Sequence, residues 1–236
     1  MTNVVALLQE LRDGDRYVRE RAAGVLKDHV DNPEIQEVLL HVLRNDASGY
    51  VRWAAADALK DHVNNPEVQA AFVYALLNDA AVYVREAAVY ALRDHVESDL
   101  CDEQSTPVKA AFFHLLRNEN DPTIRKVAAK ALTGRVNEPE VQEALLHVLL
   151  NENDPTIRKA AAGALIDHGN DPAVQEALLH VLLNENDPTI REAAAEALKD
   201  HVNTPEIQAV LLHVLLNDKD EGVRLTAAMA LRDHVE

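Results

Sequence analysis

Apolar residues recur with a helical period along the whole chain, in two alternating types of segment. At about 100° per residue, the apolar positions of each type fall on one face of a predicted helix. In the first type, for example residues 155–168, this face carries Ile157, Ala161, Ala164, Leu165 and His168. In the second type, for example residues 139–151, it carries Val141, Ala144, Leu145, Val148 and Leu149. The exposed edge of the second type is then formed by Gln142, Glu143, Leu146 and His147.

The two helix types form a unit that repeats along the sequence. An arginine after a β-branched residue marks each first-type helix and returns every 33 residues, with one gap of 40; these arginines are Arg19, Arg52, Arg85, Arg125, Arg158, Arg191 and Arg224. Local residues place the helix starts, because Asp154 is a good N-cap and Pro155 tolerates the first helical position. A fixed period of this length predicts a stacked repeat array.

The pattern predicts an all-α fold, a right-handed α-solenoid of about seven two-helix repeats. We expect one domain over residues 1–236, with an N-terminal half-repeat at 1–12, six full repeats at 13–217 and a C-terminal half-repeat at 218–236. The seven extra residues fall in a polar loop at about 97–106, where an insertion either carries binding or is simply tolerated.

The motif Asp-x-x-Val/Ile-Arg-x-x-Ala-Ala-x-Ala-Leu, followed by Val-Gln-x-Ala-Leu-Leu, resembles the short HEAT-like repeats also found in phycobilisome lyases. The resemblance covers nearly the whole chain and implies a protein-binding scaffold, since such repeats only occasionally carry chemistry. It also implies that the seven arginines form a structural ladder to acids of adjacent units. For Arg158 the expected partner is Asp121 or Asp154.

Composition and charge narrow the function. The net charge is −17, which argues against nucleic acid, because nucleic-acid binders cluster Lys and Arg to displace counterions. The apolar runs are too short to span a bilayer, and the N-terminus lacks a basic leader, so we expect a cytoplasmic protein without a membrane partner. The single cysteine, Cys101, forms no intramolecular disulfide, and its acidic neighbours disfavour a reactive thiolate.

Eleven histidines raise the question of a metal site. They form two columns: His29, His62, His95, His168, His201 and His234 at first-type helix ends, and His41, His114, His147, His180 and His213 on second-type helices. Members of a column are one repeat apart, roughly 10 Å, whereas zinc ligands lie about 2 Å from the ion. We therefore expect no metal and no other cofactor, and we interpret the first column as helix capping.

Three enzymatic alternatives remain weaker than binding. Deoxyhypusine hydroxylases resemble this fold and bind iron through His-Glu pairs, but this chain repeats Asp-His instead. A DNA-base glycosylase would need a basic concave surface, and a bilin lyase would need a chromophore-sized pocket. We expect no catalytic residues and a protein that is not an enzyme.

The aromatic residues point to the binding surface, because none lies beyond residue 113. Exposed aromatic residues are favoured interface anchors. We expect a protein or peptide partner, favoured to be basic by the acidity of the chain, at His41, Trp53, Tyr74, Tyr90 and Phe113. Phe72 and Phe112 instead occupy a core column. The near-identical later repeats leave a designed or consensus-derived scaffold as an alternative origin, and the sequence specifies no oligomeric state.

Overall fold

The computed structural model describes residues 4–97, 105–202 and 204–232, and within these ranges it contains helices and no strand. The loop expected to carry the seven-residue excess lies mostly outside the described residues, at 98–104. Helix contacts divide the chain into two compact units, Met1–Leu115 and Leu116–Glu236.

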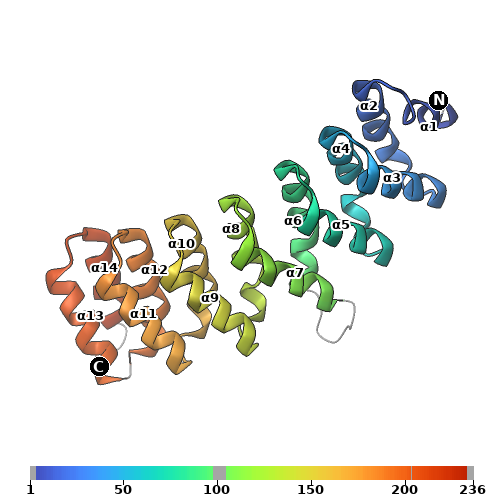
Figure 1. The fold of residues 1–236 in the computed structure, drawn as a ribbon. Coiled ribbons are helices and arrows are strands. Elements are labelled where there is room, and N and C mark those ends of the chain that lie inside the picture. Colours follow the sequence, from blue (N-terminus) through green and yellow to red (C-terminus); the bar gives the residue numbers. More distant parts are fainter. Residues whose placement is uncertain (1–3, 98–104, 203, 233–236) are drawn as a thin grey trace. The chain divides into compact units, whose positions relative to one another are not determined.

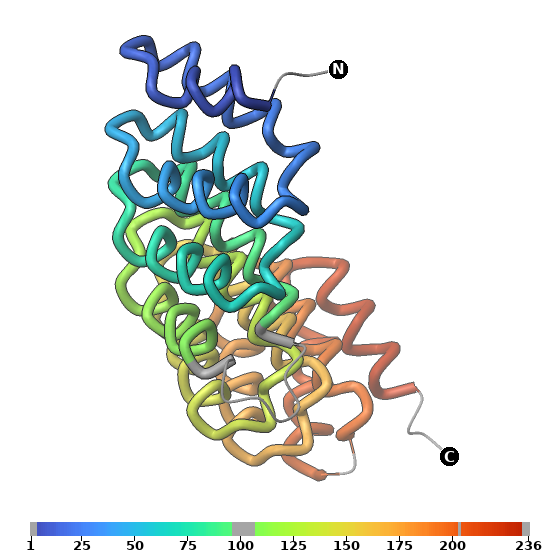
Figure 2. Tube along the Cα trace, turned by 90° about the vertical axis from the view of Figure 1, so that its right-hand side faces the viewer, coloured from blue at the N-terminus to red at the C-terminus, as the bar shows by residue number. Residues whose placement is uncertain are grey.

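Helices of the two types alternate in the first unit (Figure 1). The first-type helices are α2 (Arg16–Leu26), α4 (Gly49–Leu59) and α6 (Val82–Glu97). The second-type helices are α1 (Val4–Glu10), α3 (Pro33–Asn45), α5 (Pro66–Asn78) and α7 (Ser105–Asn118). Helix α4 packs against both α2 and α6, and α3 packs against α5, so each type forms its own layer. Figure 2 shows these pairs following one another in blue and green.

The second unit repeats the arrangement. Its first-type helices are α8 (Pro122–Ala131), α10 (Pro155–Ala164), α12 (Pro188–Leu198) and α14 (Glu221–Arg232). Its second-type helices are α9 (Pro139–Asn151), α11 (Pro172–Asn184) and α13 (Pro205–Asn217).

Short 3-10 turns follow five first-type helices of the two units: η1 (Lys27–His29), η2 (Lys60–His62), η3 (Thr133–Arg135), η4 (Ile166–His168) and η5 (Lys199–His201). The all-helical repeat fold is therefore as expected.

The helix starts follow the local chemistry. The carboxylate of Asp154 accepts a hydrogen bond from the Thr156 amide, and Pro155 opens α10. Asp121 and Asp187 cap α8 and α12 in the same way. In the second type, Asn32 and Asn65 cap α3 and α5, each before a proline. Side-chain acceptors at these positions satisfy amides that have no partner within the helix.

The core lies between the two layers and between successive helices of one layer. All five expected residues of α9 are buried, and so are Phe72 and Phe112. In α10, Ala160 and Ala162 are buried in addition to the expected face. The reason is that α10 packs against α8 on one side, α12 on the other and α9 across the layers. Alanine at these positions permits close helix approach.

Four histidines of the first column, His29, His62, His168 and His201, end 3-10 turns and are half-buried. In the part of the chain that the structure describes, their imidazoles donate no hydrogen bond to a helix carbonyl, so the expected capping is not observed. His201 instead packs close to Gly169, where an added Cβ would lie 2.5 Å from the imidazole Cδ2 atom. No described helix is both long and apolar enough to cross a membrane.

Candidate protein-interaction surface

The repeated arginines connect each repeat to the next. In five of them the Nε atom donates to the acid 27 residues further along the chain, at 2.6 to 3.1 Å. The described pairs are Arg19–Asp46, Arg52–Asp79, Arg125–Glu152, Arg158–Glu185 and Arg191–Asp218. The Nη1 atom of each donates to backbone carbonyls of the loop before its own helix, as it does in Arg85 and Arg224. Each described pair thus joins two inter-helix loops.

The acid partner differs from the expected one. Arg158 binds Glu185 and not Asp121 or Asp154. Asp154 is engaged as the N-cap of α10, so its carboxylate faces the Thr156 amide and hydroxyl. Glu185 is the first residue after α11, where it also accepts the Asp187 amide. The partner is therefore the residue that ends a second-type helix.

These contacts shift the ionisation of both partners. Burial acts to raise the pKa of Glu185, but the hydrogen bond from Arg158 and backbone amides outweigh it, so the pKa lies below its usual value. The same balance lowers the pKa of Asp46, whereas for Asp218 the hydrogen bond from Arg191 is the largest cause of the lowering. The hydrogen bonds to the acids raise the pKa of Arg19, Arg52, Arg158 and Arg191. Both partners are charged in the folded chain at neutral pH.

A groove of about 730 Å³ opens between α1 and α3. We call it the first-unit groove. Leu8, Leu11 and Val38 contribute apolar lining, and the exposed Glu34, Glu37 and His41 contribute polar lining. Arg12, Val42, Asn45, Asp46 and Ala47 complete it. The structure thus places His41, one of the five expected partner residues, in a cleft.

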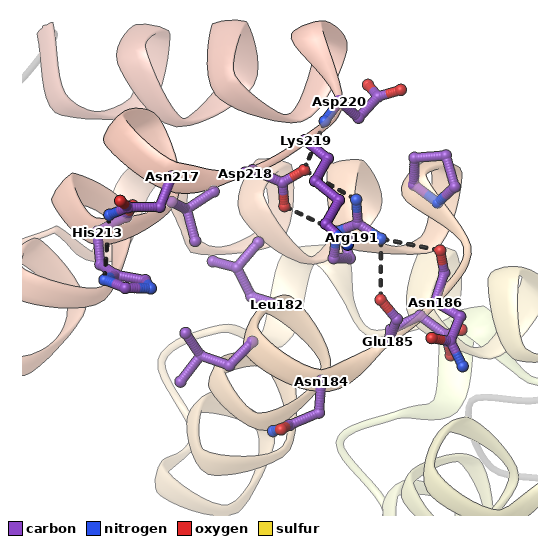
Figure 3. Close-up of a pocket in the computed structure, with 13 residues that line it drawn as sticks. Leu182, Asn184, Glu185, Asn186, Arg191, His213, Asn217, Asp218, Lys219 and Asp220 are labelled. Carbon is purple, nitrogen blue, oxygen red and sulfur yellow. Dashed lines mark hydrogen bonds and ion pairs between the residues drawn. The ribbon is translucent and has the colours of Figure 1, made fainter.

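An equivalent groove of about 520 Å³ lies between α11 and α13 in the second unit. Figure 3 shows Arg191 in this groove, bonded to Asp218 and to the carbonyls of Glu185 and Asn186. His213 and Asn217 occupy the positions that His41 and Asn45 hold in the first-unit groove. In both pairs the asparagine amide donates to the histidine carbonyl and lies 3.2 to 3.3 Å from Nδ1 of the imidazole.

The other four expected partner residues divide between the two layers of the first unit. Tyr74 on α5 is 58% exposed and Phe113 on α7 is half-buried. Trp53 on α4 and Tyr90 on α6 are 42% and 46% exposed. The five residues therefore form two sets, His41 with Tyr74 and Phe113 on second-type helices, and Trp53 with Tyr90 on first-type helices.

Sequence reasoning missed a third aromatic feature in the first unit. Tyr17, Tyr50 and Tyr83 are each the second residue of a first-type helix. The rings of Tyr50 and Tyr83 stack with centroids 5.1 Å apart and an interplanar angle of 21°. Their spacing of 33 residues was the available signal. Within the described residues, no cluster of three or more His, Cys, Asp or Glu side chains is arranged to hold a metal ion.

Two solved structures are similar to this chain. The E. coli protein YibA has a TM-score of 0.65 at 19% identity, with 97% of this chain and 81% of that chain covered. The complex of CpcE and CpcF of phycocyanin lyase from Nostoc sp. PCC7120 has a TM-score of 0.49 at 21% identity, with 100% of this chain and 89% of that chain covered. A search of the curated proteins found no match.

The expectation that the chain is not an enzyme was wrong and is corrected by these similarities. The complex of CpcE and CpcF of phycocyanin lyase is among the solved structures similar to this chain. One fold can host both binding and catalysis, so the repeat architecture alone does not decide between them.

The family is defined by the repeat itself. The model for HEAT repeats matches residues 4–93, 110–199 and 176–234, which together include most of the chain. These ranges contain all seven arginines and both grooves. The chain belongs to the HEAT-repeat family.

Proposed function

We propose that this HEAT-repeat chain is an interaction scaffold that binds a protein or peptide with basic side chains. The observation that carries the proposal is the first-unit groove, which combines apolar lining from Leu8, Leu11 and Val38 with the exposed carboxylates of Glu34 and Glu37. An apolar lining suits an aliphatic side chain, and carboxylates suit a lysine or arginine beside it.

The exposed edge of the second-type helices extends this surface in the proposal. Tyr74 holds the position on α5 that His41 holds on α3, and its side chain is among the most exposed large side chains of the unit. Phe113 lies on α7, one residue before the equivalent position. An extended or helical ligand that follows successive helices would contact these side chains in turn. Trp53 and Tyr90 offer a second contact on the first-type helices.

The test compares variants at the expected anchor residues with variants on the second-type helices of the later repeats. A pull-down with the intact chain and a Trp53→Ala/Tyr74→Ala double variant identifies a partner, whose affinity is then measured for each single variant. We expect Tyr74→Ala or Trp53→Ala to weaken binding by about 2 kcal/mol or more, as expected for an aromatic anchor. His180→Ala and His213→Ala are matched controls on the later second-type helices and are expected to change little. A complex in which the partner contacts only residues 140–236 would contradict the proposal.

A further inference from the structure

The tyrosines at the second position of α2, α4 and α6 form a continuous strip together with an arginine. The Arg16 guanidinium carbon lies 4.3 Å from the ring centroid of Tyr17 and 4.8 Å from that of Tyr50. Its Nη2 also donates to the Tyr17 hydroxyl at 2.8 Å. Tyr83 then stacks on Tyr50. We call Arg16, Tyr17, Tyr50 and Tyr83 the tyrosine strip.

The strip is open to solvent. Tyr17 is 64% exposed although Arg16 covers one of its faces, and Tyr50 is 49% exposed although it contacts both Arg16 and Tyr83. A core role would bury these rings, as it does Phe72. Large exposed aromatic side chains grouped on one surface are typical of contact sites.

Two carboxylates beside Tyr17 are available to a cation. Asp13 and Asp15 are exposed, and their oxygens accept only backbone amide hydrogens, from Asp15 and Tyr17 respectively. Asp46 and Asp79, which hold the position of Asp13 in the next two repeats, are ion-paired with Arg19 and Arg52. Among the described residues, neither Asp13 nor Asp15 forms an ion pair. Negative charge therefore adjoins the open face of the strip.

We propose that the tyrosine strip is a binding site for arginine side chains of a protein partner. A guanidinium is favoured over the face of an aromatic ring, and the strip already holds one between two rings. A partner's guanidinium stacks on the open face of Tyr17 and donates to Asp13 or Asp15. The strip lies on first-type helices, whereas the first-unit groove lies between second-type helices, so this inference does not rest on the proposed function.

Other ligands fit the strip less well. A proline-rich helix docks in slots between aromatic rings, but Tyr50 and Tyr83 stack directly on each other. Single-stranded nucleic acid also stacks on aromatic rings, but it needs a positively charged groove. The strip instead adjoins Asp13 and Asp15 in a chain of net charge −17.

The second unit supplies a matched replacement for the test. Thr123, Thr156 and Thr189 occupy the tyrosine position in α8, α10 and α12. Tyr17→Thr and Tyr50→Thr therefore introduce a residue that this position already accepts. They remove the rings and leave the net charge unchanged, so general attraction between an acidic chain and a basic peptide is retained.

The measurement is fluorescence anisotropy of a labelled peptide of alternating arginine and glycine, at low and at physiological salt. We expect the Tyr17→Thr/Tyr50→Thr variant of the full chain to bind this peptide about two- to fivefold more weakly, in line with a solvent-exposed cation–π contact. Asp13→Asn/Asp15→Asn should also weaken binding, since asparagine preserves the N-cap of α2. The same peptide with lysine in place of arginine should bind the unmodified chain less tightly, because lysine lacks the planar guanidinium.

Two results would overturn the proposal. One is equal binding by the unmodified chain and the Tyr17→Thr/Tyr50→Thr variant, with circular dichroism showing both folded. The other is tighter binding of a proline-rich peptide than of the arginine peptide. His180→Ala, on α11 of the second unit, should leave arginine-peptide binding unchanged. The strip is tested with Tyr17→Thr/Tyr50→Thr and the arginine peptide, and the first-unit groove with Tyr74→Ala and its own partner, so failure of one and failure of the other are distinguishable.

Discussion

Arg158 donates from Nε and Nη2 to the two carboxylate oxygens of Glu185, at 2.8 and 2.9 Å. The two side chains are only 16% and 10% exposed. A bidentate ion pair of this kind fixes the orientation of both side chains and is stronger than a hydrogen bond between neutral groups. Because Nη1 also holds the carbonyls of Glu152 and Asn153, one guanidinium organises the loops on both sides of a repeat.

Removal of this guanidinium is expected to destabilise the fold. Arg158→Ala leaves the largely buried Glu185 carboxylate and two loop carbonyls without their partner, at a cost of about 1–3 kcal/mol in the free energy of unfolding. Urea melts monitored by circular dichroism measure it. Lys159→Ala, which removes an exposed charge from the same helix, is the control and should change stability little. Neutral effects for the alanine variants of Arg125, Arg158 and Arg191 would contradict a structural role.

The acid partners make stability depend on pH. The pKa values of Asp46, Glu185 and Asp218 are lowered in the folded chain. Their contribution is therefore fully present above the unfolded-state values of about 3.9 to 4.3 and is lost as the pH falls through the folded-state values. Urea melts from neutral pH to about pH 3 should show this decline. Glu185→Gln should reduce it; an equal decline in this variant would mean that Glu185 does not contribute.

Two exposed glycines inside helices offer stabilising substitutions. A Cβ on Gly24 in α2 or Gly163 in α10 would meet nothing within 4 Å. Alanine there restricts the unfolded chain, so Gly24→Ala and Gly163→Ala should each add about 0.5–1 kcal/mol. Gly49→Ala is the contrast, because its Cβ would overlap the Tyr83 hydroxyl and displace that ring. Thermal melts that show no gain at Gly24 and Gly163 would refute this expectation.

Chelation should leave the repeats folded. Histidines of one column lie on successive repeats, roughly 10 Å apart, which is too far for shared coordination of one zinc ion. We expect the same helicity and melting temperature with and without EDTA. Elemental analysis that finds about one tightly bound zinc or iron per chain, lost together with helicity on chelation, would contradict the spacing argument.

The helices and their caps could be predicted from the sequence because short-range chemistry determines them. The stripe from Val141 to Leu149 follows from periodicity, and Asp154 with Pro155 follows from the needs of a helix start. The burial of Ala160 and Ala162 could not be derived in this way, since it depends on helices packed on both sides of α10.

The contacts between repeats were harder to predict. Asp121, Asp154 and Glu185 all belong to columns that recur with the period of Arg158, so spacing alone does not identify its partner. Identifying Glu185 also requires the knowledge that the Asp154 carboxylate is used as a helix cap. The tyrosine strip was overlooked for a different reason. The position of the last aromatic residue does not reveal it, whereas the 33-residue spacing of Tyr17, Tyr50 and Tyr83 places them at the same point of three helices.

The bond from an arginine to an acid 27 residues later, present in five described pairs, has a consequence for how such a chain changes length. Loss of residues 152–184 would leave Glu185 at that same separation from Arg125, so the junction would close with an equivalent ion pair. Gain of one unit would work in the same way. Each unit of a repeat array contacts only its neighbours. Recombination can therefore add or remove whole units without requiring a new kind of contact, so the number of units can change while the contacts at each junction stay the same.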